Sequence, residues 1–163
     1  MRRRIMLNNP PASSVWHLPL GISWLTAFLR AEGHYVVQHY GHICGAEYVL
    51  RQSGDIAIEG ALATVRDPHA DIFALYKARK SFERVSRAMP TKDQFVIERN
   101  NVRCVSQNHD GTIERAIDAM DNPETNPWYD YFITEELPMA HDFQPDIYGV
   151  SINDERQFVP GIV

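Results

Sequence analysis

The fold is decided by three stretches within the first 40 residues: RIMLNNPP at 4–11, GISWLTAFLRA at 21–31 and YVVQHY at 35–40. The first is a continuous apolar run that two asparagines and two prolines end, as in a short strand covered on both faces. The second repeats apolar residues at three- and four-residue spacing, which predicts a core-packed helix. Its expected core positions are Ile22, Leu25, Phe28 and Leu29, widened by Trp24 and Ala27. The third is rich in β-branched and aromatic residues and predicts a second strand.

A strand, a helix and a strand of these lengths form a right-handed crossover, in which the strands are parallel and the helix covers one face of the sheet. Gly33 is expected to end the helix as a C-cap. A third strand is predicted at 146–152, introduced by Gln144 and Pro145. The sequence therefore predicts an α/β fold with a Rossmann-like, doubly wound parallel sheet. Because such sheets usually have about five or six strands, residues 1–163 are expected to form a single but incomplete domain.

Residues from about 41 to 143 are predicted to be a helical insertion between the second and third strands, because they are too long for one crossover helix. An amphipathic helix is expected over 72–89, ended by Pro90. Its apolar positions are Ile72, Phe73, Tyr76, Phe82, Val85 and Met89. Residues 95–105 are compatible with an extended segment, a hairpin or a loop.

Two further helices are predicted within this insertion. The first covers 113–120. The second begins at Asn126, whose side chain would cap it, with Pro127 in its first turn. Pro138 is expected to kink or end that helix.

The composition excludes several classes of function. The formal net charge is −5 and the dense basic run is confined to Arg2–Arg4, so no broad positive surface for nucleic acid is expected. The apolar residues after these arginines are too few for a signal peptide or a membrane span. Cys44 and Cys104 lie far apart without metal-ligand spacing, and we expect them to be packing thiols of a cytoplasmic protein.

The common motifs of nucleotide binding and hydrolysis are absent. The chain has neither G-x-G-x-x-G nor G-x-x-x-x-G-K-[ST], and the G-x-S-x-G motif is broken at Asn153. His34, His39 and His42 are spread over about 15 Å or more of the second strand, too far to share one metal ion. No catalytic residue and no metal ligand is therefore assigned.

Two groups of conspicuous side chains are expected to be structural. The tryptophans are expected to pack in the core: Trp16, Trp24 and Trp128. The carboxylates of the later half are expected on solvated faces: Glu135, Glu136, Asp142, Asp154 and Glu155.

Ligands of open parallel sheets bind beyond the carboxyl ends of the strands, where loops and helix N-termini present free backbone donors. Three loops meet this description: 8–20, the loop that starts near Gly41, and 151–154. Gly21 would permit close backbone approach, and Ser151 offers a hydroxyl at a strand end. Each also has a structural explanation, since Gly21 can ease a tight loop and Ser151 can cap the next helix.

Taken in order, these segments resemble the N-terminal cobalamin-binding domain of cobalamin-dependent radical S-adenosylmethionine enzymes. The resemblance rests on Ile5 to Pro11, on Leu18 to Ile22, on the helix and second strand from Leu25 to Val37, and on Pro145 to Ser151. Some members that act on peptides or natural products carry extra helical segments between the second and third strands. The segment from about 41 to 143 resembles these.

The resemblance implies a set of cobalamin contacts in the strand-end loops: Pro10, Pro11, Pro19, Leu20, Gly21, Ser151, Ile152 and Asn153. It also implies S-adenosylmethionine and a four-iron four-sulfur cluster, both held by a radical S-adenosylmethionine barrel domain in the same or another chain. The implied activity is methyl transfer to an unactivated carbon or phosphorus of a peptide or natural product. This domain would hold methylcobalamin against the barrel.

The sequence departs from the family in two motifs. The Cys-x3-Cys-x2-Cys motif that holds the cluster is missing, and Cys44 and Cys104 cannot supply it, so this chain should not catalyse the reaction alone. The Asp-x-His-x-x-Gly motif that ligates cobalt in other cobalamin folds is missing too. The cobalt ligand therefore stays unassigned.

Two other interpretations remain open. The first is a non-catalytic Rossmann-like interaction or regulatory module, which would bind a protein or small effector through the helices between Asp67 and Asp142. The second is a remnant fragment, whose incomplete sheet leaves an unpaired edge able to aggregate. The exposed third strand predicts self-association.

Overall fold

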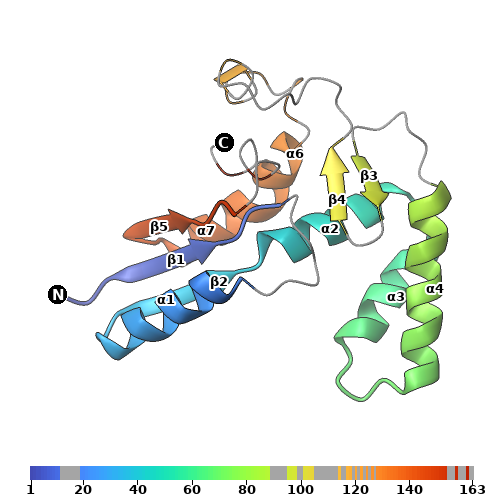
Figure 1. Ribbon diagram of the computed structural model, residues 1–163, viewed down its shortest axis with the longest axis horizontal. Coiled ribbons are helices and arrows are strands. Elements are labelled where there is room, and N and C mark those ends of the chain that lie inside the picture. Colours follow the sequence, from blue (N-terminus) through green and yellow to red (C-terminus); the bar gives the residue numbers. More distant parts are fainter. Residues whose placement is uncertain are drawn as a thin grey trace.

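The computed structural model describes residues 1–11, 19–88, 95–98, 101–104 and 128–153, with isolated residues between 114 and 126 and at 157 and 161. Its centre is a parallel sheet of three strands in the order β2-β1-β5 (Figure 1). The strands are β1 (Arg4–Asn8), β2 (Tyr35–His39) and β5 (Ile147–Val150). The predicted α/β fold with a Rossmann-like parallel sheet is confirmed.

The strand register divides the sheet into two faces. Ile5 of β1 is aligned with Val36 of β2 and with Ile147 of β5. Because successive side chains of a strand point to opposite faces, Ile5, Leu7 and Val36 share the first face. Met6, which is fully buried, points to the second face. Both faces of β1 are therefore covered, as its continuous apolar run predicts.

The first face is covered by α1 (Leu20–Ala31), the predicted crossover helix. Ile22 and Thr26 are buried, and Leu29 packs against the same cluster as Ile22. These residues are four and three positions apart, so they form one stripe along the helix. This stripe closes the core formed by β1 and β2.

The predicted core face of α1 was wrong for its outer residues. Trp24 is 80% exposed, Phe28 60% and Leu25 45%, although all three were expected to be packed. The sequence gives α1 a wider apolar surface than the described strands can cover. A helix seated on two strands buries only the stripe that points at them.

The turn after α1 is a Schellman motif built on Gly33. The Gly33 N–H donates to the Arg30 carbonyl (3.0 Å) and the His34 N–H donates to the Leu29 carbonyl (3.0 Å). Gly33 has a φ of 84°, a left-handed conformation that only glycine adopts without strain. The predicted C-cap is confirmed.

Replacing Gly33 with alanine is expected to lower the free energy of unfolding by about 1–2 kcal/mol, because a Cβ is strained in the left-handed region. Urea unfolding followed by circular dichroism measures the change. Gly60 is the matched control, since it lies inside a helix and a Cβ added there would meet no atom within 4 Å. Gly60→Ala should be neutral or stabilising, and an equal loss in both variants would contradict the prediction.

The second face of the sheet is covered by one helical run in three parts: α6 (Tyr129–Tyr131), the π-helical η1 (Phe132–Glu136) and α7 (Leu137–Phe143). Asn126 forms a turn just before its start, because its Oδ1 accepts a hydrogen bond from the Trp128 N–H (3.0 Å). The N-cap residue is Trp128, which has no side-chain cap, so the predicted capping by Asn126 was wrong. Pro138 lies in the first turn of α7, directly after the π-helical segment, and does not end the run. At the far end Phe143 stacks on Tyr35 of β2, with ring centroids 5.6 Å apart.

Within its described residues, the insertion contains three longer helices and a hairpin: α2 (Gly41–Gln52), α3 (Ala57–Arg66), α4 (Ile72–Ala88), β3 (Phe95–Glu98) and β4 (Asn101–Cys104). The helix predicted at 72–89 is confirmed as α4, and β3 and β4 pair as an antiparallel hairpin, one of the alternatives for 95–105. The helices α2 and α3 were not predicted, and the predicted helix 113–120 lies largely outside the described residues. No described helix is long and apolar enough to cross a membrane.

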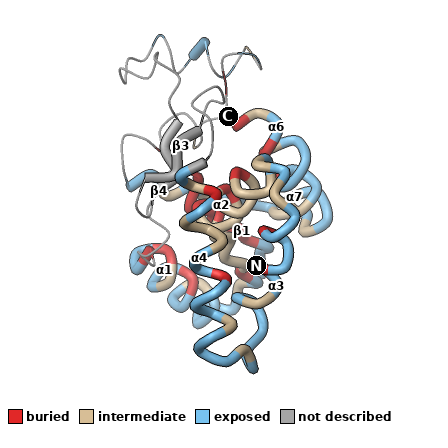
Figure 2. Tube along the Cα trace, turned by 90° about the vertical axis from the view of Figure 1, so that its right-hand side faces the viewer, coloured by how far each residue is buried: buried red, intermediate tan, exposed pale blue. Residues whose placement is uncertain are grey.

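The helices α3 and α4 lie side by side, away from the sheet (Figure 1). They bury Ile58, Leu62 and Val85 between them. Most of their remaining surface is exposed, as the pale blue of Figure 2 shows. The predicted apolar face of α4 was wrong at its start, where Ile72 and Phe73 are 77% and 76% exposed, because α3 covers only the face that carries Val85.

Candidate functional site

The candidate site lies at the carboxyl ends of β1 and β5. The chain leaves β1 towards β2 on one side, whereas β5 lies on the other side, so the boundary between β1 and β5 has the position of a topological switch point. The strand ends are joined, because the N–H of the half-buried Ser151 donates to the Asn8 carbonyl (2.9 Å). Loops from two distant segments therefore leave the sheet side by side.

Pro10 and Pro11, both predicted cofactor contacts, are fully buried beneath α2. The helix approaches them where it carries glycine. A Cβ on Gly41 would lie 2.8 Å from the Asn9 carbonyl oxygen, and one on Gly45 would lie 2.9 Å from Pro11 Cβ. The two prolines thus position α2. Because they are buried, a ligand at this edge would contact the residues around them and not the prolines themselves.

Most of the other predicted contacts are more accessible, whereas Pro19 is buried. Leu20 is 71% exposed, and Gly21 has no neighbouring atom within 4 Å of a Cβ position. Both lie at the start of α1, which follows the buried Pro19 and has no side-chain cap. Ile152 is 41% exposed and Asn153 is exposed. Among the described residues, no hydrogen bond joins the α1 entry to the turn after β5.

Asn9 ties three loops together at this edge. Its Oδ1 accepts hydrogen bonds from Asn153 Nδ2 (3.0 Å) and Gln157 Nε2 (3.4 Å). Its Nδ2 lies 2.8 Å from His42 Nδ1, and its N–H donates to the His39 carbonyl (3.2 Å). This buried side chain therefore fixes the chain ends of β1, β2 and β5 relative to one another. This role of Asn9 was not predicted from the sequence. The signal that could have indicated it is the asparagine pair at the end of β1.

His42 and His39 are held in the neutral form. Burial lowers the pKa of His42 from its usual 6.5 to about 4, and burial with the neighbouring His42 lowers the pKa of His39 to about 4. Since Asn9 Nδ2 is a donor, His42 Nδ1 accepts and its ring proton lies on Nε2. That Nε2 is buried without a hydrogen-bond partner among the described residues. If the His42 ring were protonated, its Nδ1–H would be a donor that faces the Asn9 Nδ2 donor.

A cavity of about 310 Å³ lies between the α6-η1-α7 run and β5. Most of its wall is apolar: Tyr129, Phe132, Ile133, Leu137, Ala140 and Val150. Its polar end is formed by Asn8, Glu136 and Tyr148. The volume is at the small end of the range for ligand pockets, and the combination of an apolar wall with a few polar groups is typical of them.

Glu136 is the central polar group of this cavity and is 3% exposed. Its Oε1 accepts hydrogen bonds from Asn8 Nδ2 and from the Tyr148 hydroxyl, while its Oε2 has no hydrogen-bond partner among the described residues. Burial raises the pKa of Glu136 to about 6, and the nearby hydroxyls of Tyr148 and Tyr131 oppose the shift. Burial likewise raises the pKa of the Tyr148 phenol.

The prediction that Glu136 lies on a solvated face was wrong. Its neighbour Glu135 and the later Asp142 are exposed, as predicted. Adjacent residues of a helix point in different directions, so one of two consecutive glutamates can face the sheet while the other faces water. The sequence around Glu136 contains no pattern that distinguishes this buried glutamate from its exposed neighbour Glu135.

No protein-family model, curated protein or solved structure matches this chain. The resemblance to cobalamin-binding domains therefore stays a prediction.

Cys44 is a packing thiol, as predicted. It packs against the buried cluster of Val49, Trp128 and Tyr131. Burial, reinforced by Glu47, raises the pKa of the thiol to about 11, so it stays protonated and unreactive. The side chain of Cys104 lies outside the described residues. Among the residues that the structure describes, no three histidine, cysteine or acidic side chains gather as a metal site.

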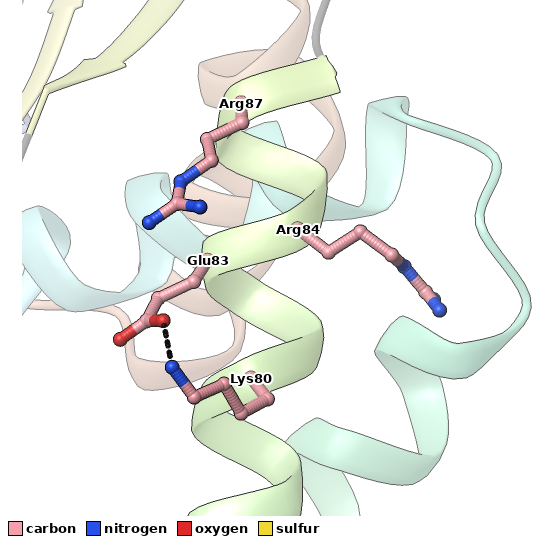
Figure 3. Close-up of a pocket in the computed structure, with 4 residues that line it drawn as sticks. All are labelled: Lys80, Glu83, Arg84 and Arg87. Atoms are coloured by element: carbon pink, nitrogen blue, oxygen red, sulfur yellow. Dashed lines mark hydrogen bonds and ion pairs between the residues drawn. The ribbon is translucent and has the colours of Figure 1, made fainter.

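A surface hollow on α4 is lined by Lys80, Glu83, Arg84 and Arg87 (Figure 3). Lys80 Nζ pairs with Glu83 Oε2 (2.8 Å), and Arg84 pairs with Asp55 across the α3-α4 unit (2.8 Å). Exposed ion pairs of this kind contribute little to stability and are usual on a solvated helix face. This hollow is not a candidate site.

Proposed function

We propose that this chain is the cobalamin-binding module of a radical S-adenosylmethionine enzyme. The observation that carries the proposal is the meeting of the β1 and β5 end loops at the switch-point position, joined by the Ser151 to Asn8 hydrogen bond. Open parallel sheets bind their ligands at this place. The identity of the ligand comes from the resemblance in residues 5–37 and 145–151.

The accessible residues at this edge fit the rim of a broad cofactor whose edge carries amide groups. Leu20 and Ile152 offer exposed apolar surface, Asn153 offers an amide, and Gly21 leaves room for close approach. Pro10 and Pro11 act indirectly, by positioning the loop.

Neither described histidine near this edge, His39 or His42, fits as a cobalt ligand. His42 is 1% exposed and its Nδ1 faces Asn9, and the His39 ring nitrogen Nε2 lies 3.5 Å from the Tyr131 hydroxyl. Both rings are engaged with protein groups. Within the part of the chain that the structure describes, the cofactor contacts would therefore come from the loops, in keeping with the missing Asp-x-His-x-x-Gly motif.

In the complete enzyme, bound methylcobalamin would supply a methyl group for transfer to carbon or phosphorus of a peptide or natural product. The radical S-adenosylmethionine barrel, in the same or another chain, would carry S-adenosylmethionine and the four-iron four-sulfur cluster. This chain would bind and orient the cofactor and would not catalyse alone.

Titration with hydroxocobalamin followed by gel filtration tests the proposal. We expect corrin absorbance to travel with the protein, and Gly21→Phe to weaken binding by about tenfold or more, since a ring there would occupy the approach to the α1 entry. Gly60→Phe is the matched control, because Gly60 is a helical glycine with equally open surroundings on α3. Absence of corrin from the wild-type protein, or equal binding by both variants, would reject the proposed site.

A second candidate function is a non-catalytic interaction or regulatory module. It is favoured by exposed apolar side chains on two helices, Trp24 and Phe28 on α1 and Ile72 and Phe73 on α4. Large exposed apolar patches mark interaction surfaces. In the described sheet β5 pairs only with β1, so self-association through its open edge remains part of this candidate. A protein that binds no corrin would favour this second function.

A further inference from the structure

The cavity beside β5 has a chemical character of its own, although it adjoins the strand-end loops through Asn8, Val150 and Gly161. It combines an apolar wall from α6, η1 and α7 with a single acidic group, Glu136. We propose that it binds a small primary amine with an apolar body, whose ammonium group pairs with Glu136 Oε2. This proposal does not depend on cobalamin binding.

One carboxylate oxygen of Glu136 is unsatisfied. Glu136 Oε1 already accepts hydrogen bonds from Asn8 Nδ2 and the Tyr148 hydroxyl, whereas Oε2 is buried and accepts none from the described residues. Buried polar atoms are nearly always hydrogen-bonded in native proteins. Because Glu136 lines the cavity, a donor carried by a ligand there would satisfy this oxygen.

The charge of Glu136 has no cationic partner among the described residues. Both groups bonded to Oε1 are donors, so these two hydrogen bonds favour the carboxylate and oppose the effect of burial, which favours the neutral acid. Among the described residues, no lysine, arginine or histidine lies within ion-pair distance of Glu136. A buried carboxylate without a cation is costly, and a ligand ammonium group would supply the missing partner.

Apart from its polar residues, the cavity is lined by apolar side chains. Phe132, Ile133, Leu137 and Val150 offer no strong hydrogen-bond groups, so sugars and polar amino acids would leave their polar groups unsatisfied. The volume of about 310 Å³ admits only a small molecule. An arylalkylamine or alkylamine satisfies both conditions, because one charged head is attached to an apolar body.

The raised pKa of Glu136 supports this assignment. Burial without a cation shifts the pKa to about 6, and an ammonium group beside Oε2 would lower it again. Glu136 also lies in the π-helical segment η1, and single π turns inside α-helices occur frequently at functional sites.

Calorimetric titration with benzylamine tests the proposal, with benzyl alcohol as the neutral isostere. We expect saturable binding of benzylamine at pH 7 and binding of benzyl alcohol weaker by about tenfold or more, since the alcohol carries no charge. Glu136→Gln should remove this preference. Glu135→Gln, which changes the exposed neighbour in the same turn, should retain it.

A second variant separates the loss of the site from the loss of the fold. Ala140→Leu adds bulk to the cavity wall and should weaken both probes, while circular dichroism should show a folded protein. Binding of benzylamine that survives Glu136→Gln, or no saturable binding at millimolar concentration, would overturn the proposal. Gly21→Phe should leave benzylamine binding unchanged, so failure of the cobalamin proposal and failure of this one are distinguishable.

Discussion

Replacement of Trp128 with alanine is expected to lower the free energy of unfolding by about 3–5 kcal/mol, a large part of the stability of an ordinary domain. Trp128 is 1% exposed and packs edge to face on Tyr131, with ring centroids 5.9 Å apart. Its ring also reaches the surface of α2, where a Cβ on Gly45 would lie 3.0 Å from Trp128 Cζ3. The change would therefore open a cavity between α2 and the helical run on the second sheet face.

Trp24→Ala is the matched control, because the same residue type is replaced at a position that is 80% exposed. Its expected effect is within about 0.5 kcal/mol, as for other exposed substitutions. Urea unfolding followed by far-ultraviolet circular dichroism measures both variants without depending on tryptophan fluorescence. Similar losses in the two variants would show that Trp128 does not hold the described core.

Trp128 also supports the loop after β1 through α2. Trp128 and Pro11 both contact the position of Gly45 in α2, and α2 buries Pro10 and Pro11. We therefore expect Trp128→Ala to disturb the loop after β1 together with the core.

Acidification is expected to destabilise the protein between about pH 6.5 and pH 4. In the fold His39 and His42 have a pKa lowered to about 4, whereas in the unfolded chain they take up protons at the usual 6.5. A lowered pKa of the folded state contributes stability that is complete above pH 6.5 and is lost as the pH falls. At about 1.4 kcal/mol per pKa unit, each histidine accounts for roughly 3 kcal/mol.

Glu136 acts in the opposite direction over part of the same range. Its pKa is raised from 4.5 to about 6 in the fold, so its contribution is complete below pH 4.5 and is lost as the pH rises through 6. This amounts to roughly 2 kcal/mol. Because the two histidines act together, a net loss of roughly 2–3 kcal/mol is expected on going from pH 7 to pH 5.

Urea unfolding at pH 7 and pH 5 measures this loss. His42→Gln keeps an acceptor for Asn9 Nδ2 but cannot be protonated, so the variant should show only about a quarter of the wild-type pH dependence, because Glu136 still opposes the remaining contribution of His39. His69→Gln changes an exposed histidine and should behave as the wild type. An unchanged pH dependence in His42→Gln would show that His42 does not carry the effect.

The elements of the sheet follow from local sequence. A continuous apolar run ended by Asn-Asn-Pro-Pro, a helix closed by Gly33 and a β-branched segment were sufficient to predict β1, α1 and β2. Asn126 likewise marked the start of the helical run on the second face, although it does not cap it. These signals act within a few residues, through backbone conformation and capping, so they can be recognised without knowledge of the tertiary fold.

The helices α2 and α3 were not predicted, and both contain glycine, a residue of low helix preference. Gly41 and Gly45 lower the intrinsic helix preference of α2, yet they are required where the helix touches the loop after β1. The tertiary contact therefore overrides the local preference. The same contact explains why Pro10 and Pro11 are buried and not exposed at the edge of the sheet.

The sequence by itself determined the parallel α/β sheet, the turn at Gly33 and the convergence of strand ends at one edge of the fold. Only the tertiary structure decided that Trp24 and Phe28 are exposed, that His42 is buried and that Glu136 faces a cavity instead of water. The physical reason is that burial depends on partners far away in the chain: the hydrogen bond between Asn8 and Glu136 joins residues 128 positions apart. Periodicity shows which side chains share a face, but the packing partner decides whether that face is covered.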